Sequence, residues 1–248
     1  MTISIGIIGH GHFGQHLVRD LIPRFARTAT VKIFSPGEAG EKFAPLQEVA
    51  TCGVVVLAVP IRVYEEVLLA VLPHVRRETV IVDVASVKGY TSGLFRKYVG
   101  NACGYICMHP MFGPQSFLKR GGHVAGFKIV VTEQTLPPDI YRVVKRVLVG
   151  FEFDVVEMTA AQHDRHLAET LFLTHFVGQI VHRAEFDNTA MDTVSFELLM
   201  DAVKSVAGDG GIFEDVYRYA REPCDEVLRV FNAAQELVRA RLASVHPP

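Results

Sequence analysis

SIGIIGHGHFG, at residues 4–14, joins a short apolar run to a glycine-rich turn and then to an amphipathic stretch. Its glycines have the Gly-x-Gly-x-x-Gly spacing. Gly9 suits a tight turn, Gly11 lets a pyrophosphate approach the backbone, and Gly14 lets the following helix pack closely on the strand. The N-terminus of that helix offers unpaired N–H groups to phosphates. The stretch predicts a dinucleotide-binding unit, and the alternative is a purely structural turn. The predicted cofactor contacts are Gly9, Gly11, His12, Phe13 and Gly14.

Short β-branched runs alternate with helical stretches as far as Glu157. Several of these runs, such as VVVLAV, are continuously apolar, which suits strands covered on both faces. The alternation predicts a mostly parallel sheet with helices on both sides. The predicted strands are Ser4–Ile8, Val31–Phe34, Val54–Val59, Val80–Val84, Tyr105–Met108, Lys128–Thr132 and Asp154–Glu157.

The alternation of strands and helices ends after Glu157. Thr159 and Gln162 have the spacing of a capping box at the start of a helix. The rest of the chain shows helical patterns and no convincing strand. We therefore predict an α/β fold with two parts. An N-terminal Rossmann-like, mostly parallel sheet domain occupies residues 1–158, and a C-terminal all-helical domain occupies residues 159–248.

Composition excludes several classes of protein. The 248 residues are 49% hydrophobic and 21% charged, which suits a well-packed core, and a net charge of -2 argues against nucleic acid as a partner. No apolar run approaches the roughly 20 residues that span a bilayer, and the N-terminus lacks a secretory signal. We expect a soluble, cytoplasmic protein. Cys103 and Cys107 lie about 13 Å apart on a strand, too far for a disulfide or a shared metal, so buried free thiols and no metal site are expected.

The end of the second predicted strand bears on the choice of cofactor. NAD-binding units usually place a carboxylate here, against the ribose 2'-hydroxyl. The sequence reads Phe34-Ser35-Pro36-Gly37, with no carboxylate before Glu38. Because Ser35 can donate a hydrogen bond to a 2'-phosphate, NADP is the predicted cofactor. NAD stays open, since no arginine stands beside Ser35.

Three further segments follow predicted strands and should meet at the edge where ligands of such sheets bind. Ala58-Val59-Pro60 is predicted to flank the cofactor, although Pro60 also suits a simple strand end. Asp83-Val-Ala-Ser86-Val-Lys88 places a hydroxyl and an amine at the rim, with a helix cap as the alternative role of Ser86. His109-Pro-Met-Phe-Gly-Pro114 places an imidazole near the expected nicotinamide. Histidine suits removal of a hydroxyl proton, although a loop histidine before proline, taken alone, is more often structural.

Taken together, these motifs resemble the prephenate and arogenate dehydrogenase family of tyrosine biosynthesis. They occur in the family's order, and the HPMFGP segment after a DxxSVK segment is the specific part of the match. The matching pieces are Gly9–Gly14, LAVP at Leu57–Pro60, DVASVK at Asp83–Lys88, HPMFGP at His109–Pro114, QHD at Gln162–Asp164, and His175.

The resemblance implies an NAD(P)-dependent oxidative decarboxylation that converts a cyclohexadienol to a phenol. His109 would accept the proton of the C4 hydroxyl, and Ser86 would bind that hydroxyl and orient the histidine. His175 would face the substrate pocket, and His163 would help to form the junction between domains.

Substrate choice within the family depends on whether an ammonium group is recognised. HPMFGP and the segment Ala207–Tyr217 are similar to the arogenate-type, plant-like branch, and Gln115 stands where prephenate-using relatives often have a carboxylate. Asp192 is the predicted ammonium partner, or else a helix N-cap. Lys204 replaces the arginine with which bacterial members bind a substrate carboxylate, so carboxylate recognition stays open.

Arogenate dehydrogenase is thus the leading prediction, with prephenate dehydrogenase as the runner-up. A hydroxyacid dehydrogenase or imine reductase is a second hypothesis, but it does not explain HPMFGP. A cofactor-sensing binding protein, which would be indifferent to His109, is a third. The expected partner is a small molecule, with no nucleic acid or membrane. Apolar rows in the helical part and the family resemblance predict a homodimer through that domain.

Overall fold

The computed structural model describes residues 3–207 and 210–245. Within it the chain forms two compact units, Met1–His163 and Asp164–Pro248. We call them unit 1 and unit 2 and describe each by itself. Gly208 and Asp209 lie outside the described residues. They belong to the segment Ala207–Tyr217, which was compared above with the arogenate-type branch.

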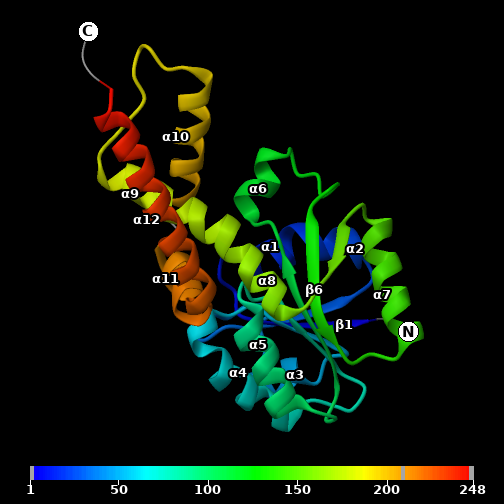
Figure 1. Cartoon of the computed structure of the whole chain (residues 1–248). Coiled ribbons are helices and arrows are strands. Elements are labelled where there is room, and N and C mark those ends of the chain that lie inside the picture. The colour runs from blue at the N-terminus through cyan, green and yellow to red at the C-terminus, as the bar shows by residue number, and fades with distance from the viewer. Residues whose placement is uncertain (1–2, 208–209, 246–248) are drawn as a thin grey trace. The chain divides into compact units, whose positions relative to one another are not determined.

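Unit 1 is built on a seven-stranded sheet in the order β2-β1-β3-β4-β5-β6-β7 (Figure 1). All neighbouring strands are parallel except β5 and β6, which are antiparallel. Each of the seven predicted strands is confirmed, with ends that move by a few residues. The strands are β1 Ser4–Ile8, β2 Thr30–Phe34, β3 Val54–Leu57, β4 Val80–Asp83, β5 Gly104–Pro110, β6 Lys128–Gln134 and β7 Asp154–Glu157.

Helices cover both faces of this sheet, as continuously apolar strands require. Val55, Leu57 and Ile81 pack with α3, α4 and α5 on one face. Ile106 and Ile129 pack with the α1–α2 segment, α6 and α7 on the other. The helical segments of unit 1 are α1 His12–His16, η1 Leu17–Leu21, α2 Ile22–Phe25, α3 Leu46–Ala50, η2 Ile61–Val63, α4 Tyr64–Val71, η3 Leu72–His74, α5 Lys88–Leu94, η4 Phe95–Val99, α6 Pro114–Lys119 and α7 Pro138–Gly150.

The strand order reverses at β1, which pairs with β2 on one side and β3 on the other. In open α/β sheets ligands bind outside the carboxyl ends of the strands at such a point. The glycine motif follows β1, and the Ala58–Pro60 segment follows β3. The topology thus places these two predicted cofactor segments side by side.

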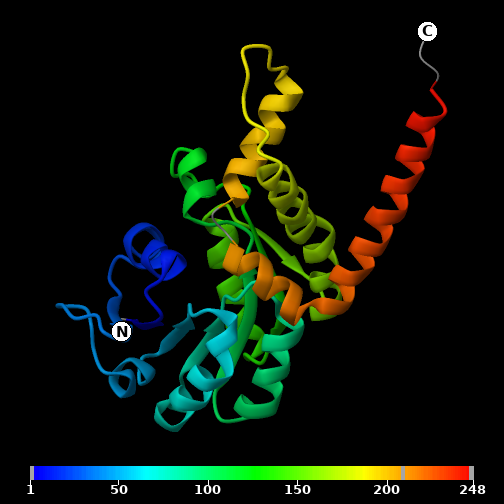
Figure 2. The ribbon, with the colours of Figure 1, turned by 90° about the vertical axis from the view of Figure 1, so that its left-hand side faces the viewer.

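Unit 2 is built from helices, and its described residues contain no strand. Gly178 of α9 lets α10 approach closely, because a Cβ at this position would lie 2.4 Å from Val206 Cγ2. Phe172 stacks on Phe213 and Tyr217 of α11 at ring-centroid distances of 5.2 and 5.9 Å. Figure 2 shows α12 as one continuous helix. The elements are η5 Ala168–Phe172, α9 Leu173–Arg183, α10 Val194–Val206, α11 Gly210–Tyr219 and α12 Arg221–Ala243, after α8 Ala160–Leu167, which spans the boundary.

The capping box at the start of α8 is confirmed. Thr159 Oγ1 accepts a hydrogen bond from the Gln162 backbone at 3.2 Å, and Gln162 Oε1 accepts one from the Thr159 backbone at 3.0 Å. The four cysteines are buried and free, as expected. No helix among the described residues is long and apolar enough to cross a membrane.

Candidate active site

The glycine loop is folded tightly against the ends of β1 and β3. Gly9 has φ +100°, and a Cβ on it would lie 2.4 Å from Ala58 O. A Cβ on Gly14 would lie 2.1 Å from Gly9 O, so the first turn of α1 packs directly on the loop. Beside Gly11, by contrast, no heavy atom lies within 4 Å of the ideal Cβ position. These residues fit a dinucleotide, because the backbone at Gly11 is open to a pyrophosphate while its neighbours hold the turn.

Backbone hydrogen bonds tie this loop to both neighbouring strands. Gly9 N donates to Phe34 O at 2.9 Å, and Ala58 N donates to Ile8 O at 2.8 Å. The predicted cofactor segments at the ends of β1, β2 and β3 are therefore brought together. Val59 and Pro60 continue from Ala58 into η2, and Phe13 lies edge-on to Phe112 at 6.5 Å.

The end of β2 does hold a carboxylate. Ser35-Pro36-Gly37-Glu38 forms a β-turn in which Glu38 N donates to Ser35 O at 3.2 Å and Gly37 has φ +79°. Proline and a positive-φ glycine at the two central positions are typical of a type II turn. The turn brings Glu38 back to Ser35, whose hydroxyl donates to Glu38 Oε1 at 3.0 Å. Glu38, the first carboxylate after the strand in the sequence, therefore lies beside Ser35 and bears on the choice between NADP and NAD.

His10 links the same carboxylate to the glycine loop. Its Nδ1 lies 2.7 Å from Glu38 Oε2, and its ring contacts Phe43 edge-on. The hydrogen bond from His10 and the weaker one from Ser35 lower the pKa of Glu38 despite an opposing effect of partial desolvation. The carboxylate is thus anionic at neutral pH and oriented on both oxygens.

His109, the candidate base, lies near the carboxyl end of β5 and is buried, with 6% of its surface exposed. Its Nδ1 lies 3.0 Å from Nε2 of His163, which α8 brings from 54 residues along the chain. His163 is also buried. Burial, then the neighbouring His163 and Lys88, hold the pKa of His109 well below its usual value. The imidazole is therefore neutral at physiological pH, as a general base must be.

A neutral imidazole has one N–H and one lone pair. If His109 Nδ1 carries the proton and donates it to His163, the lone pair is left on Nε2. His163 then selects the tautomer that makes Nε2 of His109 the proton acceptor. This orienting role had been predicted for Ser86, but among the described residues Ser86 makes no hydrogen bond to His109.

The Asp83–Lys88 segment differs from the prediction in two ways. Helix α5 is capped by Val87, so Ser86 is not its N-cap and instead lies half-buried in the turn after β4. Lys88 is not at the rim, because it is fully buried and forms an ion pair with buried Asp83 at 2.6 Å. The sequence around Lys88 gave no sign that Asp83 would be its partner.

The residues predicted to bind substrate lie on several elements. Gln115 is exposed on α6 in unit 1. In unit 2, His175 of α9 is buried, with its ring stacked 6.2 Å from Phe213. Asp192 is not the N-cap of α10, because Thr193 has that role. Lys204 and Asp192 are brought together through Asn188, which accepts from Lys204 and donates to Asp192 at 2.6 Å.

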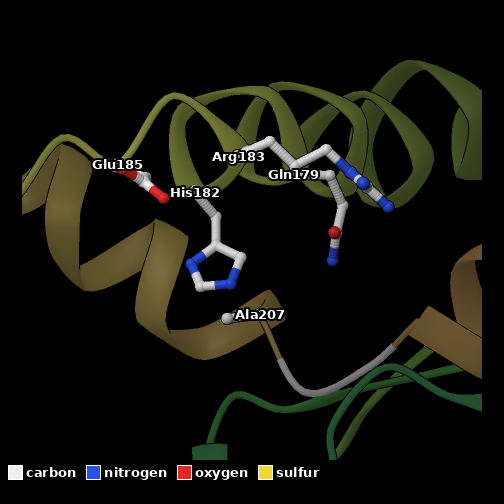
Figure 3. Close-up of a pocket in the computed structure, with 5 residues that line it drawn as sticks. All are labelled: Gln179, His182, Arg183, Glu185 and Ala207. Carbon is white, nitrogen blue, oxygen red and sulfur yellow. The ribbon is translucent and has the colours of Figure 1, made fainter.

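The segment between α9 and α10 borders two cavities in unit 2. One of about 440 Å³ is lined by Gln179, His182, Arg183, Glu185 and Ala207 (Figure 3). Lys204 lines the second, of about 450 Å³. Neither cavity is lined by His175 or Asp192. No cluster of three or more potential metal ligands occurs among residues 3–207 and 210–245.

Comparison with known proteins shows which family the chain resembles. Residues 37–129 match the family model described as the nucleotide-binding domain of prephenate dehydrogenase. This range contains the Ala58–Pro60, Asp83–Lys88 and His109–Pro114 segments. Arogenate dehydrogenases 1 and 2, the chloroplastic enzymes of Arabidopsis thaliana, are 28% and 26% identical to the chain over 97% and 99% of its length. The chain is thus similar to prephenate and arogenate dehydrogenases, and the match to the family model covers its nucleotide-binding part.

The solved structure of prephenate dehydrogenase from A. aeolicus, with hydroxyphenyl propionate and NAD+, has the same fold. Its TM-score is 0.76 at 16% identity, over 98% of this chain and 93% of that one. The chain spans 39% of the length of the first Arabidopsis enzyme and 72% of the second. The residues that match the nucleotide-binding family model lie within unit 1.

Sequence analysis missed three members of the site. The turn residues Pro36 and Gly37 were the available signal for the return of Glu38 to Ser35. The pairing of His109 with His163 had no local signal, although both residues belong to motifs that the family resemblance had singled out. The buried pair of Lys88 and Asp83 had no local signal either, because it depends on how β4 and α5 pack in the folded chain.

Proposed function

We propose that the chain catalyses the NAD(P)-dependent oxidative decarboxylation of arogenate to tyrosine, with prephenate as the alternative substrate. The observation that carries this proposal is the buried, neutral His109 with its Nδ1 engaged by His163. It lies at the same sheet edge as the glycine loop, in the HPMFGP segment. The similarity to two plant arogenate dehydrogenases supports the choice of substrate.

His109 acts on the C4 hydroxyl of the substrate in this proposal. Nε2 accepts the hydroxyl proton, which prevents positive charge from developing on the oxygen as it becomes a carbonyl. A nicotinamide dinucleotide bound at the glycine loop supplies the hydride acceptor. Loss of carbon dioxide from the ring restores aromaticity and makes the reaction effectively irreversible. Ser86, in the turn beside this strand edge, binds the same hydroxyl.

Asp192 is proposed to recognise the ammonium group of arogenate. Its carboxylate accepts three hydrogen bonds, from Asn188 Nδ2 at 2.6 Å and from the backbone and hydroxyl of Thr189 at 2.9 Å each. The hydrogen bond from Asn188 is the largest cause of the lowered pKa of Asp192. A carboxylate has about four acceptor positions, so three neutral donors orient Asp192 while leaving its charge and one position for an ammonium. Lys204 and His175 are proposed to bind the substrate's carboxylate and ring.

We infer that NAD is the preferred cofactor, in place of the NADP expected from sequence, and the geometry at the end of β2 supports this choice. An anionic Glu38 beside Ser35 attracts a ribose 2'-hydroxyl as a hydrogen-bond donor and repels a 2'-phosphate. Ser35 is itself donating to that carboxylate, so its hydroxyl is not aimed at a phosphate. We infer that Glu38 has the role usually held by an acidic residue at the strand end itself.

A homodimer is proposed through unit 2. Helix α12 exposes Val230, Leu237, Val238 and Leu242, which are 53%, 74%, 59% and 65% exposed. Val230 and Leu237 are seven residues apart and Val238 and Leu242 are four apart, so these side chains lie on one side of the helix, a pattern typical of helix–helix interfaces. Light scattering at several protein concentrations tests this directly, with twice the chain mass expected.

Four assays test the proposed reaction. Purified protein is offered arogenate or prephenate with NAD or NADP, and reduction of the cofactor is followed by absorbance. Turnover is expected with arogenate and NAD as the best pair. If prephenate gave the fastest turnover, His109 would keep its proposed role as the base, but Asp192 would lose its proposed role as the ammonium partner. Absence of turnover in all four, with cofactor binding intact, would instead favour another dehydrogenase class or a cofactor sensor.

A further inference from the structure

A buried carboxylate with four hydrogen bonds lies at the end of β4, the strand that pairs with the one carrying His109. Asp83 is the last residue of β4 and is fully buried. Its Oδ1 accepts from Tyr64 Oη and Ala85 N, both at 2.8 Å. Its Oδ2 accepts from Lys88 Nζ at 2.6 Å and Thr91 Oγ1 at 2.7 Å. All four acceptor positions of the carboxylate are thus occupied.

Lys88 extends this network to the strand that carries His109. Its ammonium donates to the Met108 carbonyl at 2.8 Å. The pairing of β4 with β5 ends at Asp83 and Cys107, and the register of β5 with β6 shifts between Cys107 and Met108. A shift of this kind leaves backbone groups outside the ladder and bends the strand. Lys88 satisfies the carbonyl there, one residue before His109.

We propose that Lys88, held by Asp83, is a positioning residue that fixes the backbone of β5 at Met108 and thereby places the imidazole of His109. The proposal rests on the proposed role of His109 as the base. Because a buried ion pair is costly to desolvate, apolar side chains at positions 83 and 88 would give about the same stability. The positioning role explains why a charged pair is found there instead. An apolar pair offers no donor to the Met108 carbonyl.

The charge of Lys88 has a second effect on the same histidine. The titratable groups that bear on His109 are His163, from α8, and Lys88, from α5, with Asp83 as the partner of Lys88. After burial and His163, Lys88 contributes to the lowered pKa of His109. Loss of the ammonium should therefore raise the pKa of His109 and make the base protonate at higher pH.

The test compares three variants of the full chain. Lys88→Met removes the ammonium, Asp83→Asn with Lys88→Met removes the pair without leaving a buried unpaired carboxylate, and Thr91→Val is the matched control. Thr91→Val removes one hydrogen bond from the same carboxylate while leaving both charges and the Met108 contact. Turnover is measured against pH, and the imidazole resonances of His109 are titrated by NMR, assigned with His109→Asn.

The double variant is expected to fold and to lose on the order of 100-fold in kcat, the effect of a small misplacement of a reacting group, with KM for the cofactor unchanged. The acid limb of its pH profile and the titration of His109 should both move to higher pH, whereas Thr91→Val should move neither. Wild-type turnover and an unmoved His109 titration in a folded double variant would overturn the inference. An equal loss of activity in Thr91→Val, with no movement of the titration, would also overturn it by showing a merely structural cluster.

The NMR titration separates this inference from the proposed function. If the wild-type protein turns over none of the four substrate and cofactor pairs, the proposed reaction fails. The movement of the His109 titration in the Lys88 variants still decides whether Lys88 acts on that imidazole.

Discussion

Nδ1 of His109 and Nε2 of His163 lie 3.0 Å apart, and both rings are buried. This contact joins the end of β5 to α8, and when Nδ1 of His109 is the donor it leaves Nε2 of the candidate base as the proton acceptor. A leucine at position 163 cannot accept the Nδ1 proton, whereas a glutamine can do so through its side-chain oxygen. His163→Leu should lower kcat by about 10²- to 10⁴-fold, the usual contribution of a positioned acid–base group. His163→Gln should retain much more activity, and equal losses in the two variants would argue against a tautomer effect.

The pH dependence of stability should contain a signature of His109. Its pKa in the folded chain lies well below the value near 6.5 of an unfolded histidine. The unfolded state therefore binds more protons in the window below about pH 6.5, and folding stability falls as the pH is lowered through that window. His109→Asn lacks this contribution. Between pH 7 and 5, urea denaturation should show a smaller loss of stability in His109→Asn than in the wild type, and parallel curves would contradict the neutral buried imidazole.

Glu38 should determine the choice between the two dinucleotides. Glu38→Ala removes a charged acceptor for the ribose hydroxyl, so NAD should bind about 10- to 100-fold more weakly, as expected for a hydrogen bond to a charged group. NADP binding should not weaken, because the repulsion of its 2'-phosphate is also removed. Glu41, which is exposed in the following loop, offers a matched control as Glu41→Ala. Equal weakening of both cofactors in Glu38→Ala would show that the carboxylate only holds the turn.

Asp192 should set the preference between the amino acid and the keto acid. Asp192→Asn keeps a side chain of the same shape but removes the charge that attracts an ammonium. The ratio of kcat/KM for arogenate to that for prephenate should fall by roughly tenfold or more, in line with a hydrogen bond between charged groups. Thr189→Val loosens the same loop without a change of charge and should leave the ratio as it is. A similar fall in both variants would assign Asp192 to loop geometry alone.

Periodicity and glycine spacing were sufficient for the sheet because these signals are local. Each predicted strand exists, and the glycine loop has the turn at Gly9 and the close packing at Gly14 that the motif requires. The helix after the loop is less regular than predicted. It contains a π-helical turn at Leu17–Leu21 just before Pro23, whose missing N–H interrupts the α-helical bonding pattern.

The site was harder to predict because its decisive contacts join distant parts of the chain. Nothing local to His109 indicates that His163 is its partner, and the burial of Lys88 depends on where β4 and β5 stop pairing. The place of Glu38 beside Ser35 was easier to foresee from the sequence. Its distance from the strand end was counted along the sequence, whereas a type II turn closes that distance in space.

The most direct test of the central claim is the turnover of His109→Asn beside its affinity for NAD. The proposed mechanism predicts a loss of about 10²- to 10⁴-fold in kcat with arogenate, with NAD binding unchanged because the glycine loop and Glu38 are untouched. His166→Ala, at an exposed histidine of α8, is the control and should retain full activity. A His109→Asn variant that keeps most of its turnover would contradict the assignment of His109 as the base.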